Sequence, residues 1–285
     1  MITQINKDLA QWAMEYALKN GCQQARVSLF NGSESSYEVR DMKTDRLLSA
    51  SENGLSIQLF VDGKFGSYST NRLTKEELGK LIKNGIDATR YLMEDTDRKL
   101  PDMTRYYKGG GVDLELYDQQ FENVGPDIKL GIAQQVCAEV MGQDQRILSV
   151  NTAFSEQDSF RYLLASNGFE GESSVSYYSV SANVSVQGEG DSRPGDGWYD
   201  FSLYLDTLEK EGIGKKALER VLRKIGQKKI ASAKLPMLVD NRTVSRLISP
   251  LINALYGAAI QQKNSFLLDK LNQKVAGDKF TVADN

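Results

Sequence analysis

The fold is decided by the stretch Leu55–Tyr68, which reads LSIQLFVDGKFGSY. Apolar and polar residues alternate at its start, a pattern typical of a strand with one buried face. Asp62-Gly63 is a turn signal, because glycine supplies the positive φ that a tight hairpin requires. The stretch therefore predicts a β-hairpin. Asn71 or Thr74 then predicts the capped start of a helix that runs to about residue 92.

The same patterns, followed outward, predict the other elements. Periodicity predicts helices over 4–20, 127–142 and 213–229 and helical segments over 242–260. Alternation predicts strands over 25–31, 35–41, 46–51, 54–61, 65–70, 146–156, 159–166, 170–188, 197–206 and 235–239. Asn31-Gly32 and Asn167-Gly168 are further hairpin turn signals. The order of helix, strands and helix occurs twice, so the sequence predicts an α+β fold of two related units, each of mainly antiparallel sheet with flanking helices.

A polar connection predicts the boundary between these two units. Residues 94–112 contain Pro101 and the triple glycine Gly109-Gly110-Gly111, a composition typical of a linker. We therefore expect an N-terminal α+β unit over 1–93 and a second α+β unit over 113–285.

Composition excludes several classes of function. The chain has no histidine among its 285 residues, which excludes His-based triads and zinc sites of the HExxH type. Its net charge is −3, so no basic excess indicates nucleic-acid binding. The two cysteines stand far apart and outside any CxxC pair, which fits a reducing compartment. No signal-peptide segment and no apolar run of membrane-spanning length is present, so we expect a cytoplasmic protein without membrane contact.

Two polar segments are candidate binding sites. The loop around 188–197 and the residues after it contain Glu189, Asp191, Asp196 and Asp200, whose oxygens suit a hard cation. The alternative is an acidic loop that is simply solvated, and the spacing does not match an EF-hand. The segment Ser173–Val186 alternates small polar residues with apolar or aromatic ones, which predicts a strand with one buried and one solvated face.

Three stretches together resemble the TldD/PmbA family. The first runs from Ser51 to Asn71 and shows a glycine, an apolar strand, an Asp-Gly turn and a Gly-aromatic-Ser pattern. The second is Ser166-Asn167-Gly168 with the Ser-rich strand and the Gly/Asp/Arg loop after it. The third is 235–285, and the order and spacing of the three cover most of the chain. The resemblance implies a TldD/PmbA N-terminal-type fold. It also implies that the family's β-rich C-terminal region lies beyond the equivalent of Asn285.

The resemblance also implies where a zinc site would lie. In the catalytic branch of the family, a helix carries an HExxxH motif, and zinc is held by both histidines and a later cysteine. The positions that match the histidines are Ile248 and Asn253, and Ser249 matches the glutamate. Isoleucine has no lone pair to donate, and a serine is no general base near neutral pH. The chain is therefore similar to the PmbA/TldE branch, which lacks the zinc motif, and we expect no catalytic residues and no metal in this chain.

The function that this resemblance implies is that of a subunit. We expect a TldE/PmbA-like, non-catalytic subunit of a cytoplasmic TldD/TldE-type zinc metallopeptidase that processes unfolded peptides. Its partner would be a TldD-like peptidase subunit that holds the zinc, in a heterodimer, or a second copy in a homodimer. The strand with Ser174, Ser176 and Tyr178 is the candidate peptide-binding strand, through main-chain pairing. The alternatives are a self-sufficient hydrolase with a carboxylate-bound metal and a modulator of DNA gyrase that acts by protein binding.

Overall fold

The computed structural model of the chain describes residues 2–109 and 113–283. Contacts divide the chain into two units, Met1–Gln227 and Lys228–Asn285, which are described separately below. The predicted division at 94–112 stays a prediction. In chain order the elements are α1 (Gln4–Lys19), β1 (Gln24–Arg40), β2 (Lys43–Val61), β3 (Lys64–Thr70), α2 (Lys75–Arg90), η1 (Met103–Arg105), η2 (Phe121–Asn123), α3 (Pro126–Ala138), β4 (Ile147–Ala165), β5 (Glu170–Val186), β6 (Gly195–Ser202), α4 (Ile213–Leu222), α5 (Ser245–Leu255) and α6 (Gly257–Gln261).

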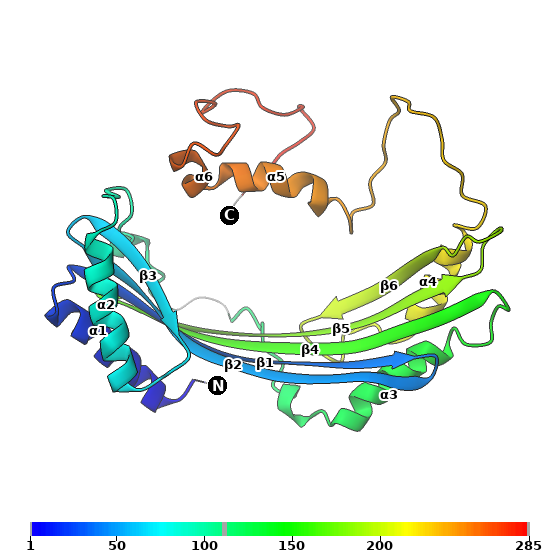
Figure 1. Ribbon diagram of the computed structural model, residues 1–285, viewed down its shortest axis with the longest axis horizontal. Coiled ribbons are helices and arrows are strands. Elements are labelled where there is room, and N and C mark those ends of the chain that lie inside the picture. The colour runs from blue at the N-terminus through cyan, green and yellow to red at the C-terminus, as the bar shows by residue number, and fades with distance from the viewer. Residues whose placement is uncertain (1, 110–112, 284–285) are drawn as a thin grey trace. The chain divides into compact units, whose positions relative to one another are not determined.

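The first unit is built on one antiparallel sheet with the strand order β3-β2-β1-β4-β5-β6. Helices α1 and α2 lie at one end of the long strands, and α3 and α4 lie at the other end (Figure 1). The prediction of an α+β fold with an antiparallel sheet and flanking helices is confirmed. Strands from both predicted units form this one sheet, because β1 pairs with β4 over Arg26–Arg40.

The prediction of a turn at Asn31-Gly32 is wrong, because both residues lie inside β1. Gly32 is paired with Glu52 on one side and with Ser159 on the other. A Cβ atom at Gly32 would lie 2.7 Å from the main-chain oxygen of Asp158. Glycine is therefore required here so that two strands can approach closely. A hairpin turn also favours glycine, so the sequence alone does not distinguish the two situations. Because no turn interrupts the chain here, the predicted strands 25–31 and 35–41 are parts of one strand, β1.

The sheet carries two hydrophobic cores on the same face. In β1, Val27 and Leu29 belong to the core beneath α1 and α2, and Val39 belongs to the core beneath α3 and α4. In β4, Leu164 belongs to the core beneath α1 and α2, and Phe154 belongs to the core beneath α3 and α4. All the β1 positions are odd-numbered and both β4 positions are even-numbered, so the two cores line one face of the pleated sheet. We call them the α1–α2 core and the α3–α4 core.

Two predicted hairpin turns and one predicted helix cap are present in the structure. Gly63 joins β2 to β3 with φ +73°, and Gly168 joins β4 to β5 with φ +95°. Thr74 caps α2, since its Oγ1 accepts a hydrogen bond from the Glu77 N–H at 3.3 Å. The hairpin turns and the helix cap that we predicted at these positions are confirmed.

The described part of the predicted linker, residues 94–109, packs against the β4–β5 hairpin. Leu100 is buried with Phe60 and Ala165. Tyr106 Oη donates to Asn167 Oδ1 at 2.9 Å. Gly110, Gly111 and Val112 of the predicted linker lie outside the described residues.

The second unit contains the helices α5 and α6. The predicted strand 235–239 is wrong, because in the described chain this stretch has no strand to pair with. Residues 235–238 are exposed, Leu238 fully so, and Val239 is half-buried. Helices are present within the predicted helical segment 242–260. None of the helices in the described parts of the chain combines the length and the apolar character needed to cross a membrane.

Candidate functional site

A strip of polar residues separates the two cores on the covered face of the sheet. Asp158 Oδ1 accepts hydrogen bonds from the main-chain N–H and the hydroxyl of Ser33, both at 2.7 Å. Glu156 Oε1 accepts from Ser35 Oγ at 2.7 Å. We call Ser33, Ser35, Glu156 and Asp158 the polar strip. Both carboxylates are only 6% exposed, so these hydrogen bonds offset the loss of water around them.

A buried ion pair closes one side of the polar strip. Lys129 of α3 pairs with Glu156, and their side chains are 10% and 5% exposed. The other carboxylate oxygen of Glu156, Oε2, has no hydrogen-bond partner among the described residues. An ion pair this deeply buried depends on both members, because either charge left alone would remain desolvated.

The segment after the predicted linker folds over β5 and is held there by Ser176. The Ser176 N–H donates to the Leu116 oxygen at 3.0 Å, and Ser176 Oγ accepts from the Asp118 N–H at 2.8 Å. The same hydroxyl donates to the Leu203 oxygen at 2.9 Å. Asp118 Oδ2 in turn accepts from the Leu205 N–H at 3.1 Å. One serine therefore fixes two loops, 113–120 and 203–206, against the strand.

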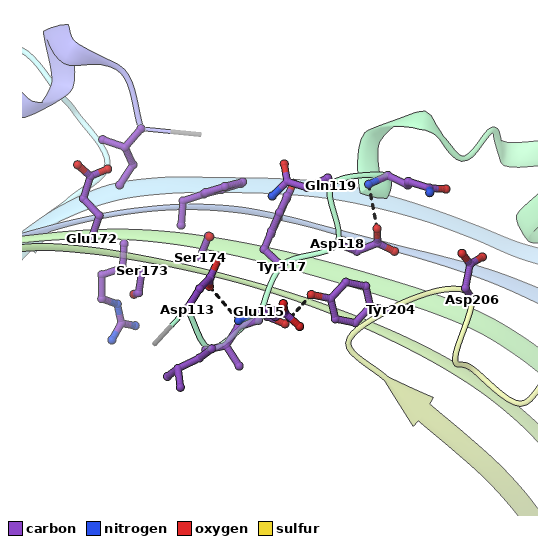
Figure 2. A pocket seen from close by; sticks show the side chains of 16 residues that line it. Asp113, Glu115, Tyr117, Asp118, Gln119, Glu172, Ser173, Ser174, Tyr204 and Asp206 are labelled. Atoms are coloured by element: carbon purple, nitrogen blue, oxygen red, sulfur yellow. Dashed lines mark hydrogen bonds between the residues drawn. The ribbon is translucent and has the colours of Figure 1, made fainter. Parts of the chain in front are cut away.

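These two loops line an open cavity of the first unit, with a volume of about 870 Å³. Figure 2 shows its wall, where Tyr204 points toward Glu115 and donates to the Glu115 main-chain oxygen at 2.7 Å. The cavity is acidic, because five of its lining residues are carboxylates and one, Arg161, is a guanidinium; the carboxylates are Asp113, Glu115, Asp118, Glu172 and Asp206. Such a lining attracts cationic or main-chain donor groups and repels anions.

Two phenols that line the cavity have raised pKa values. Burial raises the pKa of Tyr117, and the carboxylates of Asp158, Glu122 and Asp118 raise it further. Partial desolvation raises the pKa of Tyr204 above its usual range, and the negative charge of Glu115 raises it further. Both phenols are protonated at neutral pH, and the raised pKa keeps them hydrogen-bond donors further into the alkaline range.

The edge of β5 beside this cavity has no strand next to it in the described chain. Strand β6 pairs with β5 only from Tyr178 to Ser185. The Ser176 N–H points away from β4, toward Leu116. Because main-chain direction repeats every two residues, the N–H and C=O groups of Glu172 and Ser174 face the same way. Along this stretch the main-chain groups of β5 that face away from β4 are not paired with another strand of the described chain.

The structure separates the three residues of the predicted peptide-binding strand. Ser174, Ser176 and Tyr178 lie on one face of β5, but only Ser174 lines the cavity. Ser176 and Tyr178 are fully buried beneath the loops and α3. Burial raises the pKa of Tyr178 far above its usual range, and the Asp118 carboxylate adds to this shift. A peptide at this edge would meet the main chain near Ser174 rather than the other two side chains.

The residues at the zinc-motif positions all lie on α5. Ile248 carries no donor atom, and Ser249 Oγ donates to the Ser245 oxygen at 2.5 Å. Asn253 offers at best a weak amide oxygen ligand. This set does not fit a zinc ion. Elsewhere in the described residues, no three histidine, cysteine, aspartate or glutamate side chains are arranged to hold a metal.

Two of the four acidic residues of the candidate cation site, Asp196 and Asp200, are engaged in the fold. Asp196 forms ion pairs with Lys224 at 3.1 Å and with Arg220 at 3.5 Å, and it accepts from the Gly197 N–H at 2.8 Å. Burial acts to raise the pKa of Asp196, but these partners together lower it. Asp200 accepts a hydrogen bond from the main chain at 3.1 Å. These contacts favour a structural role for the carboxylates over cation binding.

Comparison with known proteins identifies the chain's relatives. Models of three domains of one family match successive parts of the chain. They are the PmbA/TldA metallopeptidase domain 1 over residues 25–89, its central domain over 119–225 and its C-terminal domain over 232–285. A metalloprotease PmbA homolog of Haemophilus influenzae is 24% identical over 280 residues, which are 98% of this chain and 61% of that protein.

Solved structures agree with this match. A crystal structure of a candidate modulator of DNA gyrase from Bacteroides thetaiotaomicron is 57% identical, with a TM-score of 0.91 over 98% of this chain and 63% of that one. TldE from Thermococcus kodakarensis shares the fold, with a TM-score of 0.70 and 16% identity over 92% of this chain and 58% of that one. The chain thus spans about three fifths of the length of these relatives. Three consecutive domain matches and the shared fold lead to one conclusion: the chain belongs to the TldD/PmbA family.

Proposed function

We propose that this chain is a TldE/PmbA-like, non-catalytic subunit of a cytoplasmic TldD/TldE-type zinc metallopeptidase that processes unfolded peptides. The observation that carries the proposal is the absence of histidine from all 285 residues. It leaves α5 with Ile248, Ser249 and Asn253, which offer no set of zinc ligands and no general base. Zinc and the hydrolytic step would then belong to a TldD-like partner subunit, with which this chain forms a heterodimer.

The contribution of this chain would be to bind the substrate. The β5 edge near Ser174 offers main-chain groups to an extended peptide, and the acidic cavity lies beside it. Main-chain pairing selects for unfolded segments over folded ones, because only an extended strand can reach these groups. Edge pairing is largely independent of the peptide's sequence, since it uses groups that every residue except proline carries.

Co-expression with a TldD-like chain tests the proposal. We expect the complex to cleave an unstructured fluorogenic peptide, and we expect this chain alone to cleave none with or without added zinc. A mixture that is no more active than the TldD-like chain alone would contradict the proposal. Cleavage by this chain alone, together with a metal that survives dialysis, would favour the self-sufficient hydrolase instead.

Two variants of Ser174 test whether the β5 edge binds the substrate. Ser174→Pro removes the N–H that faces the cavity, and proline is tolerated where that group makes no ladder bond. We expect this variant to raise the KM of the complex about tenfold, because one main-chain hydrogen bond of about 1 kcal/mol is lost and the ring obstructs the edge. Ser174→Ala keeps the N–H and should leave KM unchanged. Equal KM values in the two variants would remove the edge from substrate binding.

A second candidate function is favoured by one comparison. The relative that is 57% identical is described as a candidate modulator of DNA gyrase. For this chain, such a role would operate through protein binding, since a net charge of −3 gives no basic surface excess for DNA. A supercoiling assay of gyrase with and without the chain tests it, and an unchanged rate at a large excess of the chain would exclude it.

A further inference from the structure

The outer edge of β2 is open over most of its length. Strand β3, the last strand on this side of the sheet, pairs with β2 only from Leu55 to Val61. Over Arg46–Gly54, which we call the β2 edge, no described strand lies on the side away from β1. Most of its side chains are exposed, and Leu47 is 60% exposed. An uncovered strand edge of this length is a template for pairing with another chain.

The direction of the main-chain groups along this edge is fixed by the neighbouring contacts. The Phe60 oxygen accepts from the Gln23 N–H at 2.9 Å, so Phe60 directs its carbonyl toward β1. The β1–β2 ladder has no register shift between this point and Arg46. Even-numbered residues of the β2 edge therefore face β1, and odd-numbered residues direct N–H and C=O to the open side. Three consecutive outward residues are Leu47, Ser49 and Ser51.

The charges of the β2 edge are complementary to the same edge of a second copy. When a two-fold axis passes through Ser49, outward residues meet outward residues, as antiparallel pairing requires. Leu47 then lies opposite Ser51 of the second copy, and Arg46 lies opposite Glu52 of the second copy. Arg46 already stands beside Glu38 of its own β1. It would thus lie between two carboxylates in one row across the strands, and two-fold symmetry repeats the row.

Neighbouring registers lack this match. An axis through Leu48 places Arg46 opposite Ala50, and an axis through Ala50 places it opposite Gly54. Odd register shifts set outward residues against inward ones and break the hydrogen-bond pattern. The charge pattern thus selects one register in which the edge matches itself.

We propose that the β2 edge pairs in antiparallel fashion with the β2 edge of a second copy of this chain, with Ser49 on the two-fold axis. The pairing forms about six main-chain hydrogen bonds, two for each of three opposed outward pairs, and two symmetric Arg46–Glu52 ion pairs. It joins two six-stranded sheets into one continuous sheet. The inference goes beyond the proposed function and does not rest on it.

Cross-linking tests the register directly. Opposed residues of a hydrogen-bonded antiparallel pair have Cα atoms about 5.5 Å apart, within the range of a disulfide. We expect Ser49→Cys to form a disulfide-linked dimer under mild oxidation, while the native cysteines stay buried and unlinked. Ser69→Cys is the matched control, because Ser69 is an exposed serine on the edge strand β3. Equal cross-linking of the two variants, or none at Ser49→Cys, overturns the proposal.

Charge exchange tests the ion pairs without a covalent bond. Arg46→Glu alone and Glu52→Arg alone each replace two attractive pairs by two repulsive ones. We expect each to weaken dimerisation about 30-fold in sedimentation equilibrium, which corresponds to about 2 kcal/mol. An equimolar mixture of the two variants should restore association, since opposite charges meet again in the mixed dimer. A dimer that persists unchanged in both single variants, or a mixture that stays monomeric, refutes the assigned edge.

Discussion

Substitution of Ser176 by alanine is expected to destabilise the first unit more than any other change of one hydroxyl at the site. The hydroxyl is fully buried, and it accepts from the Asp118 N–H and donates to the Leu203 oxygen. Removal leaves both main-chain groups without a partner, and each buried unsatisfied group costs about 1–3 kcal/mol. We expect a loss of about 3 kcal/mol in the free energy of unfolding. For a unit of this size the melting temperature should fall by roughly 6–12 °C.

Urea unfolding followed by tryptophan fluorescence measures this loss, because Trp12 and Trp198 both lie in the first unit. Ser174→Ala is the matched control. It makes the same change two residues earlier on the same face of β5, at a half-buried serine whose side chain has no hydrogen bond within the described parts of the chain. A difference of less than about 1 kcal/mol between the two variants would refute the assignment of Ser176 as the anchor of both loops.

Three further predictions follow from the buried and charged groups. Lys129→Met should destabilise the chain by about 3–5 kcal/mol in urea unfolding, because Glu156 stays buried without its cation, and K129M/E156L should recover most of this loss. Burial raises the pKa of both cysteine thiols, so neither should react with Ellman's reagent at pH 8 until guanidinium unfolds the chain; rapid labelling of the native protein would contradict their burial. The guanidinium of Arg146 lowers the pKa of Asp144 to about 2, so its stabilising effect is complete above the unfolded value near 4 and is lost as the pH falls toward 2. NMR titration of the Asp144 carboxyl checks this value, and a midpoint near 4 would exclude the pairing.

The sequence predicts the local elements well because local chemistry decides them. Gly63 and Gly168 sit at turns that require a positive φ, and Thr74 offers the hydroxyl that caps a helix. The failures arise where neighbours decide the structure. Gly32 resembles a turn residue, but two flanking strands and a close oxygen atom hold it extended. The predicted strand 235–239 has the right composition, but it finds no strand to pair with in the described chain.

The candidate site was only partly predictable for the same reason. The alternation along β5 identifies Ser174, but it gives no sign that Ser176 and Tyr178 lie beneath a loop. The segment 113–120 has no periodicity, so nothing local shows that it folds back over the strand and lines a cavity. The buried Lys129–Glu156 pair joins a helix to a strand 27 residues away, and no spacing rule connects them. In contrast, the lack of histidine needs no structure to be recognised.

The long strands that pass through both cores restrict which insertions and deletions the sequence can tolerate. β1 and β4 run through both cores, so the alternation of inward and outward side chains must stay in phase along their whole length. A single-residue insertion in the polar strip would turn one core's side chains toward solvent while the other kept its place. We therefore expect this middle region to accept replacements of individual residues far more readily than insertions or deletions, which only a compensating bulge could absorb.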